Sequence, residues 1–466
     1  MEKKRNSFTG SLGFVLAAAG SAVGLGNIWR FPYLAAKDGG GLFLVIYIIL
    51  ALTFGFTLLT TEISIGRITK QSPLTAYSKI KKGWGFMGVI ACLIPMIIMP
   101  YYCVIGGWII KYLVAFLTGD GVTASQDGYF TNFITGDVQP ILFTIIFLCI
   151  TAFVVFRGVE KGIESFSKII MPLLLILVLA IAIFSVTMKF TDAEGVTRTG
   201  LEGLKIYLVP NLEGLTVKQF FSVLLDAMGQ LFFSLSVAMG IMVAYGSYVR
   251  DDANLVSSIN QIEIFDTVVA ILAGVMIIPA VFTFMGTEGM EASGPSLMFI
   301  SLPKVFHAMG GVGIVIGGLF FAMVLFAAIT SSVSIMEAIV ASLMDKFHMS
   351  RIKAAVIETV IALVGGIIVC LGYNKLYFDI ILPNGAHAQV LDVMDYISNN
   401  ILMPIVAIGT CILIGWVAKP KTVIDEVEKT GHKFGRKHLY IVMIKVIAPL
   451  LLVILFLKSL GLLTAI

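Results

Sequence analysis

The sequence predicts an all-α polytopic membrane protein in which eleven transmembrane helices form a 5+5 inverted repeat plus one extra helix. Three observations favour this class. First, 58% of the 466 residues are hydrophobic and only 13% are charged, too few charges to cover a soluble domain of this length. Second, the apolar residues fall into eleven segments that reach the length needed to cross a bilayer, about 20 residues. Third, the first and sixth segments are interrupted in the same way.

The expected spans follow one another along a single membrane domain that covers residues 1–466. They lie near residues 11–36, 41–66, 87–117, 139–156, 166–187, 218–247, 259–285, 310–344, 352–373, 387–417 and 438–460. Residues 1–190 would form the first five-helix repeat, 216–417 the second, and 418–466 a cytoplasmic loop and the eleventh helix. Because five is odd, the second repeat enters the membrane from the opposite side, and helices 1 and 6 take matching positions.

The basic residues predict the orientation of the chain. They gather before the first span and after the second, fourth and tenth spans, at Lys3, Lys4, Arg5, Arg67, Lys70, Lys79, Lys81, Lys82, Arg157, Lys161, Lys168, Lys419, Lys421, Lys429, Lys433, Arg436 and Lys437. If eleven spans alternate, these loops share one side, which the excess of Lys and Arg marks as cytoplasmic. The N-terminus would then be cytoplasmic and the C-terminus extracellular or periplasmic. The net charge of +4 therefore reports membrane topology and does not indicate a nucleic-acid partner.

Cysteine and histidine patterns argue against a disulfide frame, a transition-metal site or an enzyme. The five cysteines lie inside apolar segments without CxxC spacing, and the five histidines are dispersed, so we interpret the cysteines as small core residues. No nucleophile with a base and no HExxH-like pair is present. We expect no organic cofactor.

The interruptions of the first and sixth spans are the most informative feature. "GSAVGLGN" (20–27) lies in the first and "FFSLSVAMG" (232–240) in the sixth. Small residues also allow plain close packing of membrane helices, but Asn27, Arg30 and Pro32 follow the first run. Unwound backbone inside a bilayer persists only where protein, water or a ligand satisfies its polar groups. Similarly broken helices in two inverted halves indicate a transporter binding site.

Buried polar residues suggest what binds there. Asp266 lies well inside the seventh span with no Lys or Arg nearby in sequence, so it either holds a proton or has a cation as its partner. Sodium prefers oxygen ligands, which hydroxyls in the sixth and eighth spans can supply, although such hydroxyls also bond back to their own helix. Two further carboxyls, Glu62 and Glu337, are expected to meet between helices.

Several ordered motifs resemble the neurotransmitter:sodium symporter family, in its bacterial amino-acid transporter branch with the leucine-transporter-like fold. They are "GSAVGLGNIWRFPY", "GGGLFLVIYIILALTFGFTLLTTEISIGR", "IPMIIMPYYCVIGGW", "GQLFFSLSVAMG", "GPSLMFISLPKVF", "FAAITSSVSIME" and "LDVMDY". The resemblance covers residues 1–417. It implies sodium-coupled secondary active symport of an amino acid into the cell by alternating access.

The resemblance also implies two sodium sites and one substrate site. The first sodium site would use the Ala22 carbonyl with Asn27, Ser234, Asp266 and the substrate carboxylate. The second would use the carbonyls of Gly20, Val23 and Ala327 and the hydroxyls of Thr330 and Ser331. The substrate pocket would be lined by Ser21, Ala22, Leu25, Gly26, Ile98, Tyr102, Phe233, Ser234, Ser236, Met239, Ser331 and Ile335.

Three positions refine the expected function. Gly24 stands where monoamine-transporting members carry an Asp, so the substrate would bring its own carboxylate, as an amino acid does. Asp266 places a fixed negative charge where many relatives have Asn, and Ala270 adds no second acid, which predicts chloride-independent transport. Met239 can re-pack around ligands of different shape and favours a hydrophobic or aromatic amino acid, although it is also a normal core residue.

The resemblance implies two gates as well. On the outside, Arg30 would pair with Asp395 above a lid of Tyr102 and Phe233. On the inside, Arg5 would pair with Asp345, with Phe8, Ser247 and Tyr248 nearby. A transport-inactive sodium-dependent amino-acid sensor and a proton-coupled relative stay open as alternatives. So does the oligomeric state, for which a monomer is one possibility.

Overall fold

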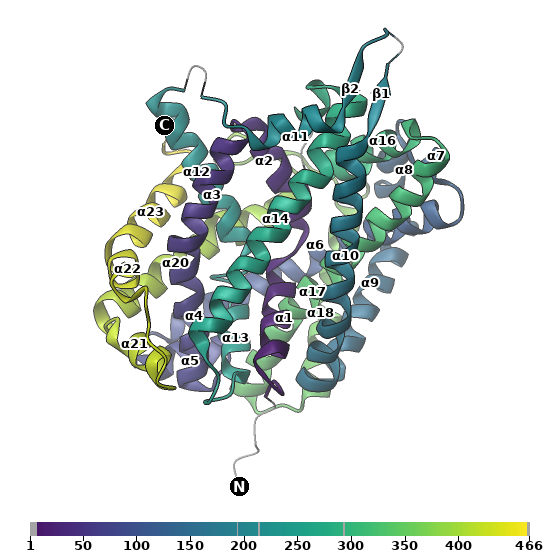
Figure 1. Cartoon of the computed structure of the whole chain (residues 1–466). Coiled ribbons are helices and arrows are strands. Elements are labelled where there is room, and N and C mark those ends of the chain that lie inside the picture. The colour runs from purple at the N-terminus through teal and green to yellow at the C-terminus, as the bar shows by residue number, and fades with distance from the viewer. Residues whose placement is uncertain (1–6, 193, 213–214, 292–293, 464–466) are drawn as a thin grey trace.

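The computed structural model describes residues 7–192, 194–212, 215–291 and 294–463. The chain forms one bundle in which α1 lies near the centre and α23 at the edge (Figure 1). The α-helices are α1 Ser11–Ala22, α2 Phe31–Lys37, α3 Gly41–Leu50, α4 Phe56–Thr69, α5 Pro73–Ile80, α6 Gly85–Leu117, α7 Gly121–Ala124, α8 Tyr129–Ile134, α9 Gln139–Phe156, α10 Ser165–Thr187, α11 Gly200–Leu208, α12 Val217–Ser234, α13 Ile241–Tyr248, α14 Leu255–Met285, α15 Gly294–Ser296, α16 Leu302–Ala308, α17 Gly311–Phe347, α18 Arg351–Leu371, α19 Val390–Asp395, α20 Met403–Ile412, α21 Lys421–Glu428, α22 Lys437–Val442 and α23 Ala448–Ser459.

Short π-helical stretches join several of these helices into longer ones. They are Gly26–Arg30, Ala51–Gly55, Val159–Glu164, Leu297–Ser301, Tyr396–Leu402, Leu413–Val417 and Met443–Ile447, and a single 3₁₀ turn covers Glu288–Glu291. Two small antiparallel hairpins complete the described elements, β1 Lys189–Thr191 with β2 Thr197–Thr199 and β3 Ile380–Ile381 with β4 His387–Ala388.

The predicted all-α membrane architecture is confirmed. Among the described residues nine helices are long and apolar enough to cross a membrane, and the bent pair Ser11–Ala22 and Gly26–Lys37 adds a tenth. The expected sixth span is present as two shorter helices, α12 and α13, neither of which is among the helices that are both long and apolar enough. The exact number of eleven crossings therefore stays a prediction.

The surface of α10 shows how the bundle faces lipid. Ile169, Ile176 and Ile183 are exposed and recur every seven residues, which places them on one side of the helix. In water such a stripe would be unfavourable, whereas hydrocarbon accommodates it. The chain is thus a multi-pass membrane protein whose apolar core continues outward into an apolar surface.

Both interrupted helices break where the sequence predicts. The first helix ends at Ala22 and resumes at Gly26 after a bend of 50°. The sixth ends at Ser234, and Ser236 (φ 53°) and Ala238 (φ 64°) then adopt left-handed backbone, which costs free energy for any residue other than glycine.

Hydrogen bonds from neighbouring helices stabilise the second break. The Ser236 hydroxyl donates to the Ser21 carbonyl (2.9 Å), and the Ala238 N–H donates to Glu62 Oε1 (2.6 Å). These bonds join the unwound part of the sixth helix to the last turn of α1 and to α4. The broken backbone therefore has the polar partners that a membrane interior requires.

Candidate functional site

The two helix breaks, together with α6 and α17, enclose a buried pocket. Its cavity volume for a water-sized sphere is about 40 Å³, and on the same measure a single water molecule needs about 10–15 Å³. All twelve residues expected around the substrate line it, with Gly24 and Asn27 in addition: Ser21, Ala22, Leu25, Gly26, Ile98, Tyr102, Phe233, Ser234, Ser236, Met239, Ser331 and Ile335. The structure thus brings together residues from four separate parts of the chain.

Asp266 lies at one side of this pocket with three hydrogen-bond donors around it. Oδ1 accepts from the Asn27 amide (2.8 Å) and the Ser234 hydroxyl (2.7 Å), and Oδ2 accepts from the Tyr47 hydroxyl (3.4 Å). The side chain is fully buried, and among the described residues no Lys, Arg or His forms an ion pair with it. A charge buried in this way needs a counter-ion, and the side-chain oxygen atoms of Asp266 and Asn27, which both lie within hydrogen-bond distance of the Ser234 hydroxyl oxygen, form with it a set that fits a cation at this place.

A second group of oxygen atoms lies between α1 and α17. The Ser331 hydroxyl is 3.5 Å from the Gly20 carbonyl oxygen and 3.1 Å from that of Ser21, and the Thr330 hydroxyl is 3.0 Å from the Ala327 carbonyl oxygen. A side chain on Gly20 would meet Thr330 at 3.3 Å, so the two helices are in close contact here. Four of the five expected ligands of the second sodium site are thereby adjacent, and the fifth, the Val23 carbonyl, is not among these contacts.

The polar end of the pocket is formed by Tyr102 and the first helix break. The Tyr102 hydroxyl is buried and has no hydrogen-bond partner among the described residues, a costly arrangement unless a ligand supplies one. A Cβ on Gly24 would lie 2.8 Å from the Ser331 hydroxyl oxygen and 3.6 Å from the Tyr102 hydroxyl oxygen. Gly24 therefore keeps this corner open for an incoming polar group.

The other end of the pocket is apolar. Ile98, Met239 and Ile335 are buried around it, and Phe233 closes it toward Gly26. A Cβ on Gly26 would come within 2.8 Å of the Phe233 ring, so only glycine permits this approach. The pocket as a whole has one polar and one apolar end.

The outer gate is not closed by an ion pair in this structure. Arg30 is exposed, and no ion pair among the described residues joins it to Asp395. Asp395 Oδ1 instead accepts from the Tyr101 hydroxyl (3.0 Å) and the Asn399 amide (2.6 Å). The roles of Arg30 and Asp395 as a gate stay a prediction.

The opposite end of the first helix is closed by aromatic packing. Phe8 is buried, its N–H donates to the Tyr248 carbonyl (3.2 Å), and its ring packs edge-on against Tyr245 and Tyr248 with centroids 5.8 and 6.2 Å apart. Arg5 lies outside the described residues, so its pairing with Asp345 is not described. Asp345 Oδ2 accepts from the Ser72 N–H (2.6 Å).

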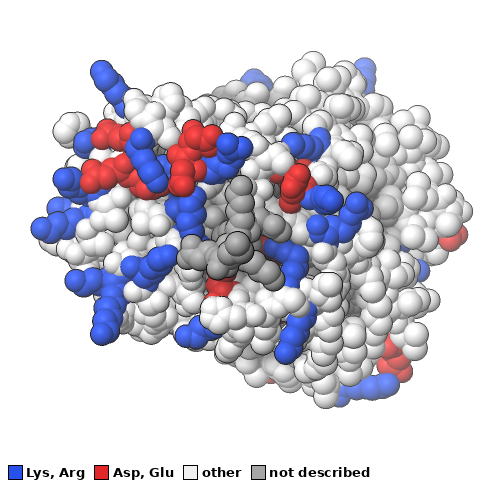
Figure 2. All heavy atoms as spheres, turned by 90° about the horizontal axis from the view of Figure 1, so that it is seen from below, with Lys and Arg blue, Asp and Glu red and all other residues white. Residues whose placement is uncertain are grey.

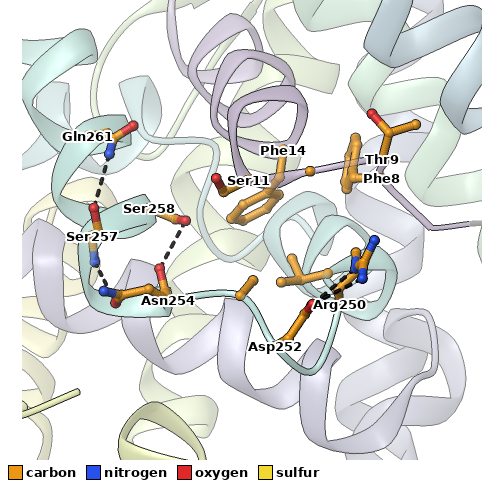
Figure 3. Close-up of a pocket in the computed structure, with 13 residues that line it drawn as sticks. Phe8, Thr9, Ser11, Phe14, Arg250, Asp252, Asn254, Ser257, Ser258 and Gln261 are labelled. Atoms are coloured by element: carbon orange, nitrogen blue, oxygen red, sulfur yellow. Dashed lines mark hydrogen bonds and ion pairs between the residues drawn. The ribbon is translucent and has the colours of Figure 1, made fainter. Parts of the chain in front are cut away.

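A larger surface pocket of about 410 Å³ lies beside this closed end. Figure 3 shows Phe8 and Phe14 on one side of it and, on the other, Asn254 just before α14 with Ser257 and Gln261 of α14. None of the expected substrate or sodium ligands lines it. It is therefore separate from the pocket between the helix breaks.

The expected contact between Glu62 and Glu337 is wrong. Glu62 Oε1 binds the backbone N–H of Ala238, whereas Glu337 pairs with Arg351 (2.6 Å) and accepts from the Tyr248 hydroxyl (2.6 Å). The reason is that only three residues separate α17 from α18, which brings Arg351 back against Glu337. Each carboxyl thus has its own partner.

Two side chains near the site, Tyr47 and Gln230, were not predicted from the sequence. Tyr47 donates to Asp266 but lies in a uniformly apolar run, and Gln230 donates to the Gly26 carbonyl (3.0 Å) from a helix rich in Phe and Leu. A polar group on an otherwise buried helix face is the pattern that would have indicated Gln230.

Broken helices at matching positions, a buried pocket between them and cation-type oxygen clusters define a membrane secondary transporter. A family model described as the sodium:neurotransmitter symporter family matches residues 5–126 and 134–465. The chain belongs to this family. It is a sodium-coupled symporter and not an enzyme.

Individual relatives agree with this assignment. The chain is 34% identical to the sodium-dependent transporter YhdH of Bacillus subtilis, over 99% of both chains, and 32% identical to a sodium-dependent transporter of Methanocaldococcus jannaschii, over 99% of this chain and 92% of the other. The human sodium- and chloride-dependent GABA transporter 2 is 27% identical over 92% of this chain and 77% of its own length.

A solved structure shares the fold. The crystal structure of MhsT in complex with L-phenylalanine superposes with a TM-score of 0.84 at 33% identity, covering 98% of this chain and 100% of that chain. The leucine-transporter-like architecture expected from the motifs is thereby confirmed.

Proposed function

We propose that this protein carries an amino acid with a hydrophobic or aromatic side chain into the cell together with two sodium ions, without chloride. The observation that carries this proposal is the fully buried Asp266 carboxylate, which has three hydrogen-bond donors but no cationic side chain. It lies beside a pocket whose polar end holds the unpartnered Tyr102 hydroxyl.

The first sodium ion would bind between Asp266, Asn27, Ser234, the Ala22 carbonyl and the carboxylate of the substrate. Because the substrate carboxylate is then a ligand of the ion, each increases the affinity for the other by the same factor. The second ion would bind between α1 and α17 at the carbonyls of Gly20, Val23 and Ala327 and the hydroxyls of Thr330 and Ser331. The Ser331 and Thr330 contacts described above support this second site.

The substrate carboxylate would accept a hydrogen bond from Tyr102 and from amide groups freed at the first helix break. The space beside Gly24 supports this orientation, since a side chain there would collide with Ser331. The apolar end, with Ile98, Met239 and Phe233, would hold the side chain of the amino acid. The phenylalanine bound to MhsT, a relative of the same fold, supports a ligand of this class.

Chloride independence follows from the same carboxylate. Donors from Asn27, Ser234 and Tyr47 surround an anion that the protein itself supplies. A fixed negative charge therefore already balances the cation, and Ala270 one turn further on is fully buried and neutral.

Transport would proceed by exchange of two gates. The lid of Tyr102 and Phe233, with Arg30 and Asp395 above it, would close the outer side, and Phe8 with Tyr248 would close the inner side. We propose that the N-terminus is cytoplasmic, so that the inner gate faces the cytoplasm. Each sodium charge that crosses a potential of 100 mV supplies about 2.3 kcal/mol toward accumulation.

Uptake into proteoliposomes tests the proposal. Labelled phenylalanine and leucine should accumulate when sodium is higher outside, equally in chloride and in gluconate, and Asp266→Ala should abolish accumulation. Competition by the twenty amino acids should show preference for apolar side chains. Binding without accumulation would contradict symport, and uptake that follows an imposed proton gradient in the absence of sodium would contradict sodium coupling.

A further inference from the structure

A pocket lined by lysines lies at the edge of the bundle, between the end of the tenth predicted span and the beginning of the eleventh. It is formed by α21, α22 and the π-helical stretch Met443–Ile447 and measures about 330 Å³. We call it the lysine pocket after its basic lining residues, which are Lys419, Lys421, Lys437 and Lys445. α21 lies at the end of the molecule that carries the start of α1 (Figure 1), and Figure 2 shows Lys and Arg side chains spread over this face.

The lysine pocket has an excess of positive charge. Asp425 is its only acidic lining residue, and it lies 4.0 Å from Lys421 in an exposed pair. Lys437 is 3.5 Å from Glu428. Exposed pairs of this kind are weak, and Lys419 and Lys445 form no ion pair in the described part of the chain. The pocket is therefore suited to an anion.

Neighbouring residues place the lysine pocket at the boundary between lipid and water. Trp416 is 62% exposed, its indole N–H donates to the Lys445 carbonyl (3.2 Å), and the Lys445 ammonium lies 5.7 Å from the ring centroid. Exposed tryptophan is typical of the interfacial belt of membrane proteins. The pocket thus lies at the depth of lipid headgroups.

An apolar strip leads from the lysine pocket into the membrane. Val442, Val446 and Leu450 are exposed and follow one another at four-residue intervals along α22 and α23, so they share one helix face. A ligand with an anionic head and a long apolar tail would contact both the lysines and this strip. A free inorganic anion would contact only the lysines.

We propose that the lysine pocket binds the phosphate headgroup of an anionic phospholipid, whose acyl chain lies along Val442, Val446 and Leu450. Lysine ammonium groups bind phosphate as point charges, and basic pockets between membrane helices recognise such headgroups. The bound lipid joins the loop 418–437 to the last helix. The site is separate from the substrate pocket and does not depend on the proposed substrate.

The test compares lipid binding to the purified full-length protein and to two variants with the same loss of charge. Lys419→Gln/Lys421→Gln/Lys445→Gln removes three lysines of the pocket, and Lys81→Gln/Lys82→Gln/Lys353→Gln removes three exposed lysines elsewhere on the same end. Native mass spectrometry and equilibrium titration are carried out with phosphatidylglycerol, with phosphatidylcholine of the same acyl chains, and with free glycerol phosphate.

We expect one phosphatidylglycerol to be retained per chain, because each lysine near a headgroup contributes about fivefold in affinity. The pocket variant should lose at least tenfold in affinity and the control variant less than twofold. Equal losses in both variants would show diffuse attraction and overturn the proposal. Equal binding of phosphatidylcholine, or of glycerol phosphate as tightly as the lipid, would overturn it as well, the latter by indicating a free-anion site.

Discussion

At the scale of single residues, the proposed chloride independence depends on Asp266. Its carboxylate accepts hydrogen bonds from three donors inside the membrane. With a neutral side chain at this position, these donors would have no anion to bind. In Asp266→Asn we expect uptake without chloride to fall at least tenfold, since a buried sodium ion loses its fixed counter-charge. Added chloride should restore part of the lost uptake.

The measurement is sodium-driven uptake in chloride and in gluconate. Asp226→Asn serves as the matched control, because Asp226 on α12 is also a carboxylate but pairs with Lys37 (2.9 Å) and Lys458 (3.2 Å). Uptake by Asp226→Asn should be the same in chloride and in gluconate. If Asp266→Asn transports equally well in both media, the carboxylate does not replace chloride.

At the scale of elements, Arg436 attaches the segment 418–437 to the bundle, in addition to the pair of Glu426 with Arg67 of α4 (2.6 Å). The Arg436 guanidinium pairs with Glu263 on α14 (3.0 Å), donates to the Leu52 carbonyl (2.9 Å) and lies 3.4 Å from the Phe56 ring centroid. Glu263 is 2% exposed as a side chain. Loss of Arg436 would therefore leave a buried carboxylate without its partner, which is more costly than losing an exposed pair.

Arg436→Ala should lower the free energy of unfolding by about 3 kcal/mol, seen as a lower melting temperature in detergent. Arg436→Leu/Glu263→Met removes both charges and should recover most of the loss, because well-packed apolar residues replace a buried ion pair at little cost. Equal melting temperatures for the two variants would show that the packing of Arg436, and not the charge left on Glu263, determines stability.

At the scale of the whole molecule, sequence patterns predict the parts of the structure that membrane physics restricts most. Helix breaks at Gly24 and Ser236, and the isolated Asp266, follow from the cost of polar groups in lipid. The structure brings the two breaks together in one pocket, and Asp266 accepts hydrogen bonds from Asn27 and Ser234 of its lining. Ion pairs between side chains on different helices are harder to predict from the sequence, because they depend on how the helices pack. Glu337 takes Arg351 as its partner because of a short turn between α17 and α18, which no periodicity shows.

The two ends of the molecule also differ in a way that predicts how sodium acts on the whole bundle. Phe8 is buried at one end, and at the other end no ion pair between described residues joins Arg30 to Asp395. The expected ligands of the second sodium ion join α1 to α17, at Gly20 and Ser331. Sodium would therefore bind more tightly to the conformation in which α1 is packed on α17 and Phe8 is buried. Sodium should then increase the population of this conformation, by an amount set by the difference in sodium affinity between the two conformations.

A cysteine at buried Ser247 reports this shift. In a Cys149→Ser background, which leaves only buried natural cysteines, the Ser247→Cys thiol should react with a polar maleimide at least fivefold more slowly in sodium than in potassium. Ser78→Cys, an exposed position on α5, should react at the same rate in both. If sodium leaves the Ser247→Cys rate unchanged, then ion binding is not coupled to closure of this end, and alternating access must depend on the substrate alone.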